Sequence, residues 1–257
     1  MPFFKPVKLI DQQKSCASFR LQRKASRVEE LAFNCLIARP HQNELGLYSK
    51  VTLGILNMDK AQFKFRPLNV EDLSHISGWL EDFDDVSWFE RSLPVPVSKE
   101  SVTENWKPDI ECTDPRKSFW FLLEDNYGNP AGICGLQGIN YIHGDAVIPV
   151  FVAKEYRNKG LAVAMIILLC DLAFGQLRLH RLSTLYRAGH EITEKLVSCS
   201  GFVEEGRVRE GWFAGGKHHD IVQVGMLKTE WEHQRPLMLK KLSERAFTVS
   251  NDVLAMH

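Results

Sequence analysis

The chain has 257 residues, 44% hydrophobic and 25% charged, which is an ordinary globular composition with room for one large domain. Its 32 Lys and Arg balance 32 Asp and Glu, so the overall charge gives no bias toward nucleic acid or an anionic membrane. The six cysteines include no C-x-x-C pair, so we expect reduced thiols and no zinc site. No apolar run is long enough to span a bilayer and the N-terminus lacks an apolar signal core, so we expect a cytoplasmic protein without a membrane partner.

Residues 1–60 carry a local positive charge, with ten Lys and Arg against five Asp and Glu. Ser26 is placed to cap a short helix over 27–33, because Glu29 stands at the return position of a capping box. We interpret this segment as an extension of unknown role that packs on the main domain. A cationic arm contacting RNA or a protein partner is the less favoured alternative, because few aromatic residues are interleaved with the charges.

The next segment predicts a strand, a helix and an acidic surface. Residues 62–68 alternate as a strand that stops at Pro67, and Asn69 begins a helix with apolar residues at helical spacing. Residues 71–114 then contain twelve Asp and Glu against three Lys and Arg. The residues alone leave two interpretations open: a solvent-facing surface, or a surface that attracts a cationic ligand.

The middle and end of the chain alternate strand and helix patterns. The predicted elements are strands over 118–123, 131–139 and 147–152, an apolar helix over 161–174, a strand over 179–186, a helix over 191–200, a hairpin from 208–213 and 221–227, and an amphipathic segment over 237–247. Pro149 lies in the middle of its strand and cannot donate a ladder hydrogen bond, so we expect an irregularity there.

The junction of the strand over 147–152 and the apolar helix is the most informative stretch. It has the sequence Arg157-Asn158-Lys159-Gly160-Leu161-Ala162. The first N–H groups of a helix have no internal partner and the helix dipole adds positive charge, so strand, glycine turn and helix together favour an anion. Gly160 permits close approach of a phosphate, while Arg157 and Lys159 add charge. The glycine spacing of dinucleotide and P-loop motifs is absent.

This R-x-x-G-x-A motif, with flanking segments 119–150 and 196–210, resembles the acyl-CoA loop of the GCN5-related N-acetyltransferases (GNAT). The resemblance covers 61–231 and is nearest to the branch of ribosomal-protein N-terminal and spermidine acetyltransferases. It implies an α/β (α+β) domain whose mixed, mostly antiparallel sheet has splayed central strands and flanking helices. It also implies an N-acetyltransferase that uses acetyl-CoA and no metal. Residues 232–257 are then a C-terminal tail.

The resemblance also assigns binding residues. The cofactor positions on the strand, on the loop and at the start of the last helix are Val150, Phe151, Val152, Arg157, Asn158, Lys159, Gly160, Leu161, Ala162 and His190. The acidic stretch falls where relatives place one wall of the acceptor site, which assigns acceptor binding to Glu81, Asp82, Asp84 and Asp85. A cationic acceptor is favoured there, either a polyamine, an aminoglycoside-like amine or a peptide N-terminus.

The residues that relatives use for proton transfer are missing. The usual Glu is Val147 and the usual Tyr is Val197. Ser198 and Cys199 are the neighbouring candidates for the general acid and Asp145 for the base, although each also fits an ordinary structural role. These departures support an alternative, a catalytically reduced acyl-CoA-binding protein that acts as a sensor or partner subunit. A longer acyl donor and a homodimer stay open.

Overall fold

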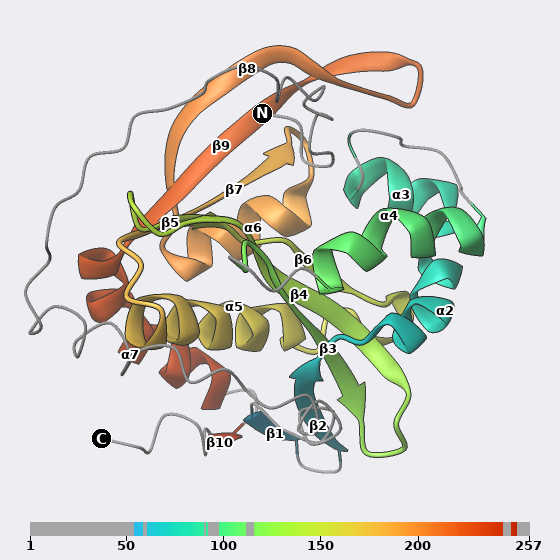
Figure 1. Ribbon diagram of the computed structural model, residues 1–257. Coiled ribbons are helices and arrows are strands. Elements are labelled where there is room, and N and C mark those ends of the chain that lie inside the picture. Colours follow the sequence, from blue (N-terminus) through green and yellow to red (C-terminus); the bar gives the residue numbers. More distant parts are fainter. Residues whose placement is uncertain are drawn as a thin grey trace, which may run out of the picture.

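The computed structural model describes residues 54–58, 61–89, 91, 98–111, 116–243 and 248–250. The predicted helix over 27–33 lies outside these residues. The described strands form one sheet in the order β10-β1-β2-β3-β4-β5-β7-β9-β8, with β6 paired to β4 beside this path (Figure 1). The strands are β1 (Gly54–Met58), β2 (Ala61–Pro67), β3 (Phe119–Asp125), β4 (Pro130–Asn140), β5 (Asp145–Val147), β6 (Val150–Val152), β7 (Arg181–Arg187), β8 (Val203–Ala214), β9 (Lys217–Leu227) and β10 (Thr248–Ser250).

The strand pairing agrees with the expected fold class. The pairs are antiparallel except for β5 with β7, which is parallel. A mixed, mostly antiparallel sheet with flanking helices is therefore confirmed. The helices are α2 (Leu73–Ile76), α3 (Phe83–Phe89), α4 (Lys99–Glu111), α5 (Leu161–Asp171), α6 (Glu191–Ser200) and α7 (Lys228–Ser243), with short 3-10 turns at Val70–Asp72, Ser77–Leu80 and Lys154–Tyr156 and a π-helical turn at Leu172–Gln176.

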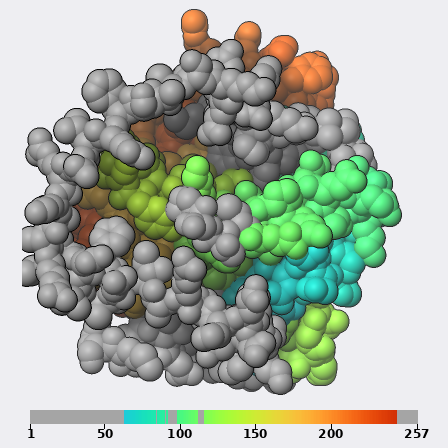
Figure 2. Space-filling model, viewed as in Figure 1, coloured from blue at the N-terminus to red at the C-terminus, as the bar shows by residue number. Residues whose placement is uncertain are grey.

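Helices cover both faces of the sheet because the strand side chains alternate between two apolar clusters. On β3, Trp120 and Leu122 pack with α2, α3 and α4, whereas Phe121 and Leu123 pack with α5, α6 and α7. Figure 1 shows α2, α3 and α4 gathered together, while α5 lies beside α7. In the space-filling view, α2 (cyan) and α4 (green) form one continuous surface (Figure 2). No helix of the described ranges is long and apolar enough to cross a membrane.

The strand that contains Pro149 is divided in two, as the proline predicts. β5 pairs with β7 up to Val147, and the N–H of Ile148 still donates to Ser183 O at 2.9 Å. Beyond the proline, β6 pairs with β4 and has left β7. The ladder between the two central strands therefore opens at Pro149, and these are the splayed strands expected from the resemblance.

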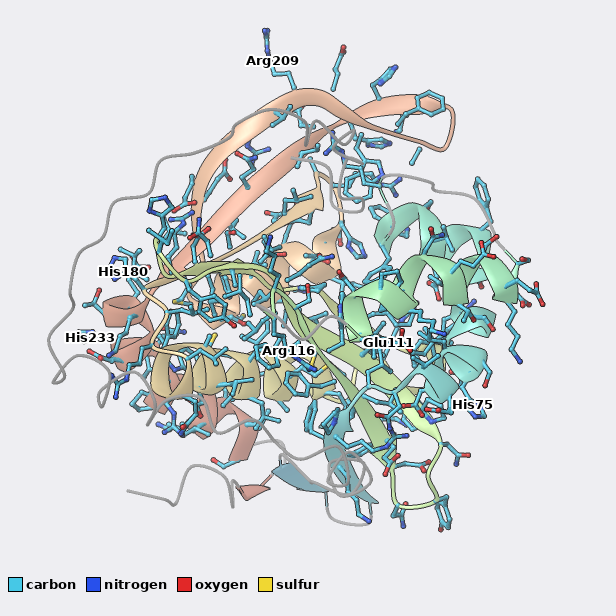
Figure 3. All side chains as sticks on the ribbon, in the orientation of Figure 1. His75, Glu111, Arg116, His180, Arg209 and His233 are labelled. Carbon is cyan, nitrogen blue, oxygen red and sulfur yellow. The ribbon has the colours of Figure 1, made fainter. Side chains whose placement is uncertain are left out.

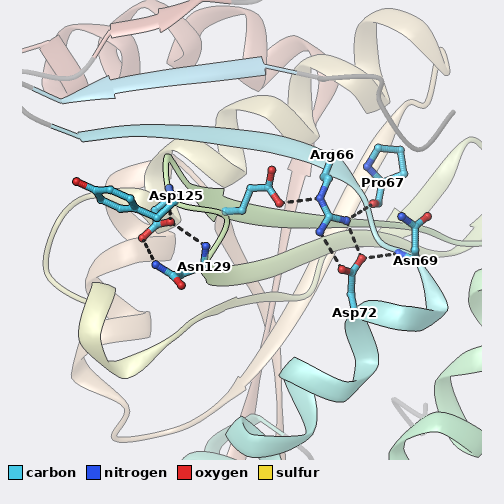
Figure 4. Close-up of polar contacts among 8 residues, drawn as sticks. Arg66, Pro67, Asn69, Asp72, Asp125 and Asn129 are labelled. Atoms are coloured by element: carbon cyan, nitrogen blue, oxygen red, sulfur yellow. Dashed lines mark hydrogen bonds and ion pairs between the residues drawn. The ribbon is translucent and has the colours of Figure 1, made fainter. Parts of the chain in front are cut away.

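Ion pairs tie the first helical segment to the sheet (Figure 4), and a hydrogen bond ties the segment before α5 to it. Arg66 on β2 donates to Asp72 at 2.7 and 2.8 Å and to Glu124 at 2.8 Å. Burial alone would raise the pKa of Asp72, but the hydrogen bonds from Arg66 lower it. Tyr156 donates its hydroxyl to Asp125 at 2.8 Å, and burial together with this bond raises the pKa of Tyr156 to about 12.

Several boundaries differ from the sequence-based expectations. The helix expected over 70–80 is α2 flanked by two 3-10 turns, and the apolar helix expected to reach 174 leaves α geometry after Asp171. The last helix begins at Lys228 rather than near 237, so it crosses the position expected for the end of the domain. Trp231, Met238 and Leu242 of this helix lie in the main core, because tertiary packing extends a pattern that is only weakly amphipathic.

Candidate active site

The turn before α5 has the backbone geometry of an anion-binding helix N-terminus. Asn158 and Gly160 are both in the left-handed region, with φ of 64° and 83°. Gly160 is the N-cap residue, and its carbonyl accepts the N–H groups of Val163 at 3.1 Å and Ala164 at 3.3 Å. The N–H groups earlier in this first turn have no place in the helical ladder and are available to a ligand. A side chain at Gly160 would be strained and would stand at the N-cap, next to these N–H groups.

A cationic side chain is held beside this turn. The Nζ of Lys159 lies 5.0 Å from the ring centroid of Tyr156, whose hydroxyl is fixed by Asp125. Lys159 is exposed, so its charge faces solvent near the loop. The turn therefore offers backbone donors and positive charge together, which suits a phosphate.

The opened ladder exposes the backbone of β6 on one side. The carbonyl of Pro149 accepts the N–H of Gly135 on β4 at 3.1 Å. The N–H of Ala153 donates to the carbonyl of Ala131 on β4 at 2.9 Å. Because N–H and C=O groups alternate along a strand, those of Val150 and Val152 point away from β4 and toward the side that β7 has left. The carbonyl of Val152 accepts the Nε of Arg157 at 3.0 Å. The remaining groups can pair with amides of an extended ligand.

The side chains of β6 face both layers. Val150 and Val152 pack against the cluster that contains α5, while Phe151 packs into the cluster of α2, α3 and α4. Phe151 contacts Trp79 and Phe89, with ring centroids 5.2 and 5.3 Å apart. The residues predicted to bind the cofactor thus gather around one turn and one strand, a placement that fits an acyl-CoA. Their contact with a cofactor stays a prediction.

Two of the four carboxylates predicted to bind the acceptor form ion pairs with cations of the segment before α5. Arg157 Nη2 donates to Asp85 Oδ2 at 2.7 Å, and Lys154 Nζ lies 3.5 Å from Asp82 Oδ2. Asp82 also caps α3, because its Oδ1 accepts the N–H of Asp85 at 3.2 Å. Glu81 is exposed. The side chain of Asp84 lies outside the described residues.

His190, the remaining predicted cofactor residue, lies at the N-cap of α6 against an aromatic side chain of α3. Its ring stacks on Trp88 with centroids 4.2 Å apart and planes inclined by 20°. Its Nδ1 lies 2.6 Å from Thr193 Oγ1. Burial lowers the pKa of His190, and the charges of Arg187 and Arg157 lower it further. The imidazole is therefore neutral at pH 7.

Sequence reasoning missed Arg187 and Trp88, which meet beside His190. Arg187 is the last residue of β7 and its Cζ lies 3.2 Å from the ring centroid of Trp88. Burial lowers the pKa of Arg187, although a guanidinium keeps its proton at neutral pH. A strand ending in arginine and a tryptophan on a short helix are common patterns, so only the three-dimensional contact distinguishes them.

The residues predicted for proton transfer lie on two different elements, Ser198 and Cys199 on α6 and Asp145 on β5. Ser198 and Cys199 are exposed on α6 and line a surface depression with Glu191, Glu194 and Lys195, while Val197 is buried in the core. The carbonyl of Cys199 accepts hydrogen bonds from Gln234 and Lys241 of α7. Asp145 begins β5 opposite Arg181, where the ladder is still closed. The catalytic assignment of these three residues stays a prediction.

Within the described ranges, no group of three or more His, Cys, Asp or Glu side chains could hold a metal ion. Backbone groups of β6 and the side chains of Arg157, Arg187 and His190 are the polar groups described above near the opened ladder.

Comparisons with known proteins agree with this geometry. The family model described as an acetyltransferase (GNAT) domain matches residues 62–203. YdaF of Bacillus subtilis (strain 168), provisionally named a ribosomal N-acetyltransferase, is 33% identical over 185 residues, which are 72% of this chain and 95% of YdaF. A spermidine N(1)-acetyltransferase of Vibrio cholerae is 28% identical over 66% of this chain and 96% of its own. The crystal structure of spermidine N-acetyltransferase from Vibrio cholerae with CoA and spermine superposes with a TM-score of 0.60 at 28% identity, covering 66% of this chain and 98% of that one.

Proposed function

This chain belongs to the acetyltransferase (GNAT) family, and from that membership we propose that it transfers the acetyl group of acetyl-CoA to a primary amine of a cationic acceptor. The family expected from the motif is confirmed, and the comparisons support an enzyme rather than the alternative of a binding protein with reduced catalysis. The observation that carries the proposal is the junction of β6 and α5. There an opened strand edge is followed, after the 3-10 turn at Lys154–Tyr156, by a helix whose N-cap residue is Gly160.

The residues around this junction have distinct parts in binding. The N–H groups of Gly160, Leu161 and Ala162 are placed for the pyrophosphate of CoA, with Lys159 beside them. The outward backbone groups of Val150 and Val152 are placed to pair with the amides of its extended arm. Acetyl-CoA supplies an activated thioester when bound. The outward backbone groups of β6 would orient that thioester by pairing with the amides of the arm.

The transfer also needs proton movements that the chain must assist. An alkyl ammonium resembles that of lysine, with a pKa of about 10.4, so the amine must lose a proton before it can attack. The C–N bond then forms as the C–S bond breaks, and the departing thiolate takes a proton. A backbone N–H of β6 is placed to stabilise the negative charge that develops on the carbonyl oxygen. Asp145 is the proposed base, and Ser198, Cys199 or a water molecule is the proposed source of the proton that the thiolate takes up.

Two observations support a cationic acceptor. The Vibrio cholerae relative is named for spermidine, whose amines are protonated at neutral pH. In this chain residues 71–114 have the acidic excess described above, and Glu81 of that stretch is exposed. Because Asp82 and Asp85 are already paired with Lys154 and Arg157, the attraction is weaker than the sequence alone suggests.

The test is the consumption of acetyl-CoA by the full chain in the presence of polyamines, aminoglycosides or short peptides. We expect amine-dependent release of CoA and a product heavier by one acetyl group. Reactions without amine measure background hydrolysis of the thioester. CoA binding without turnover on any amine would reject the proposed activity.

A further inference from the structure

Arg187 is a buried cation without an acidic partner in the described part of the chain. Only 6% of its surface is exposed, and its Nε has no hydrogen-bond partner there. No carboxylate of the described residues forms an ion pair with it. The cation–π contact with Trp88 offsets only part of the free energy that burial of the guanidinium costs through lost hydration. A buried guanidinium of this kind is stabilised by an anion that accepts its hydrogen bonds.

A second buried donor on the same face also lacks a partner. Trp212 of β8 is 4% exposed, and its indole N–H donates to no group among the described residues. It packs with Leu185 and Ile221. Leu185 lies two residues before Arg187 on β7, and Ile221 is opposite Arg187 in the register with β9. Because side chains alternate along strands, Trp212 and Arg187 project from the same face of this part of the sheet.

This face is the one that α3 covers, where the resemblance places one wall of the acceptor site. Arg187 contacts Trp88 of α3, the helix that also packs over Phe151 through Phe89. The candidate phosphate site lies at the N-terminus of α5, which packs on the opposite face. Arg157, the other arginine near His190, already has Asp85 as its partner. Arg187 thus faces α3 and has no ion-pair partner among the described residues.

We propose that Arg187 binds a carboxylate of the acceptor, so that the acceptor is an amine that also carries a carboxylate, such as an amino acid or a short peptide. The planar guanidinium fork suits a carboxylate, and the indole N–H of Trp212 is a second unpaired donor on the same face of the sheet. A polyamine would bring only positive charge to this buried cation. The inference rests on the proposed acetyltransferase function and selects among its acceptors.

Matched amine pairs that differ only in the carboxylate test this proposal. Lysine differs from cadaverine, and ornithine from putrescine, by one carboxylate, and a dipeptide acid differs from its amide by the same charge. We expect the wild-type kcat/KM to favour the carboxylate member by about tenfold or more, the usual scale of a charged hydrogen bond. R187Q should bring this ratio close to one, while R187K should keep part of it. R209Q is the matched control, because Arg209 is exposed on β8 and points away from the sheet (Figure 3).

The outcomes separate this inference from the proposed function. Equal kcat/KM within every pair for the wild type would overturn the carboxylate site and leave the acetyltransferase intact. A fall in CoA affinity in R187Q, measured by calorimetry, would assign the anion to the cofactor and also overturn the proposal. If R187Q fails to fold, the kcat/KM ratios measured for the wild type and for R187K test the proposal instead. If no amine is acetylated, calorimetry of Nε-acetyl-lysine against N-acetylcadaverine with CoA present still tests the site, and equal affinity would reject it.

Discussion

Arg157 Nη2 lies 2.7 Å from Asp85 Oδ2, so the loop before α5 is joined directly to helix α3. The same guanidinium donates its Nε to the carbonyl of Val152 on β6. One side chain therefore connects the candidate cofactor loop, the opened strand and the wall expected to meet the acceptor. The cofactor and acceptor sites are not electrostatically independent, because a charge assigned to one neutralises a charge assigned to the other.

Replacing Asp85 should strengthen CoA binding. D85N leaves Arg157 without its carboxylate, so the guanidinium charge becomes available to the nearby phosphates. An added attraction of about 1 kcal/mol corresponds to roughly fivefold in CoA affinity. The same change should lower the free energy of unfolding by about 1 to 3 kcal/mol, since it removes a charged, partly buried hydrogen bond. Calorimetry of CoA binding and chemical denaturation measure the two effects. E81Q is the control, and equal CoA affinities in D85N and E81Q would contradict the coupling.

Replacing Gly160 should weaken CoA binding beyond any effect of backbone strain. Gly160 and Gly128 have nearly equal φ, 83° and 81°, and a Cβ at Gly128 would meet nothing within 4 Å. G160V and G128V therefore carry similar strain of about 1 to 2 kcal/mol, while only G160V obstructs the helix N-terminus. We expect G160V alone to lose CoA affinity, by about tenfold or more. Equal CoA affinity in the two variants would remove the phosphate site from this turn.

His190 should make stability depend on pH. Its pKa in the folded protein is below the usual value near 6.5, so the unfolded chain takes up a proton at a higher pH than the folded chain. Above pH 6.5 His190 is neutral in both states and costs no stability. As the pH falls below 6.5 the unfolded chain takes up the proton first, so the free energy of unfolding decreases. H190N keeps an N-cap residue but cannot titrate, so its unfolding free energy should fall less steeply between pH 6.5 and 5.

Denaturant unfolding at several pH values measures this slope. H180N is the matched control, because His180 is exposed just before β7 (Figure 3). If H190N and H180N have the same slope, His190 does not carry the pH dependence.

The double variant S198A/C199A tests the proposed general acid. Loss of a proton donor typically lowers kcat by about 100-fold or more, with CoA affinity unchanged. Both side chains are exposed on α6, however, and the adjacent Val197 faces the core. We therefore expect kcat to stay within about twofold, with water supplying the proton. A 100-fold loss of kcat at constant CoA affinity would instead establish one of them as the acid.

Local features of the site were predictable from the sequence, and long-range contacts were not. Pro149 predicted the divided strand because a missing N–H breaks a ladder wherever it falls. Gly160 marked the turn before the apolar helix, and that turn is left-handed in the structure, a conformation that favours glycine. These conclusions depend on the conformations of single residues.

The pairing of Arg157 with Asp85 and the contact of Arg187 with Trp88 join positions far apart in the chain. Their charges and apolar surfaces look like ordinary surface and core residues in the sequence. Only the packing of α3 over the opened ladder brings them together. The acidic excess could be counted from the sequence, but the partners of Asp82 and Asp85 could not be inferred from it.

The pairing of β10 with β1 sets a condition on how this protein is made. β1 belongs to the first described segment and β10 to the last, so this ladder closes only after nearly the whole chain has left the ribosome. Until then the backbone of β1 remains an unpaired edge, open to strands of other nascent chains. Synthesis that stalls before residue 248 should thus release a product prone to aggregation, even though all of the acyltransferase motif has already been translated.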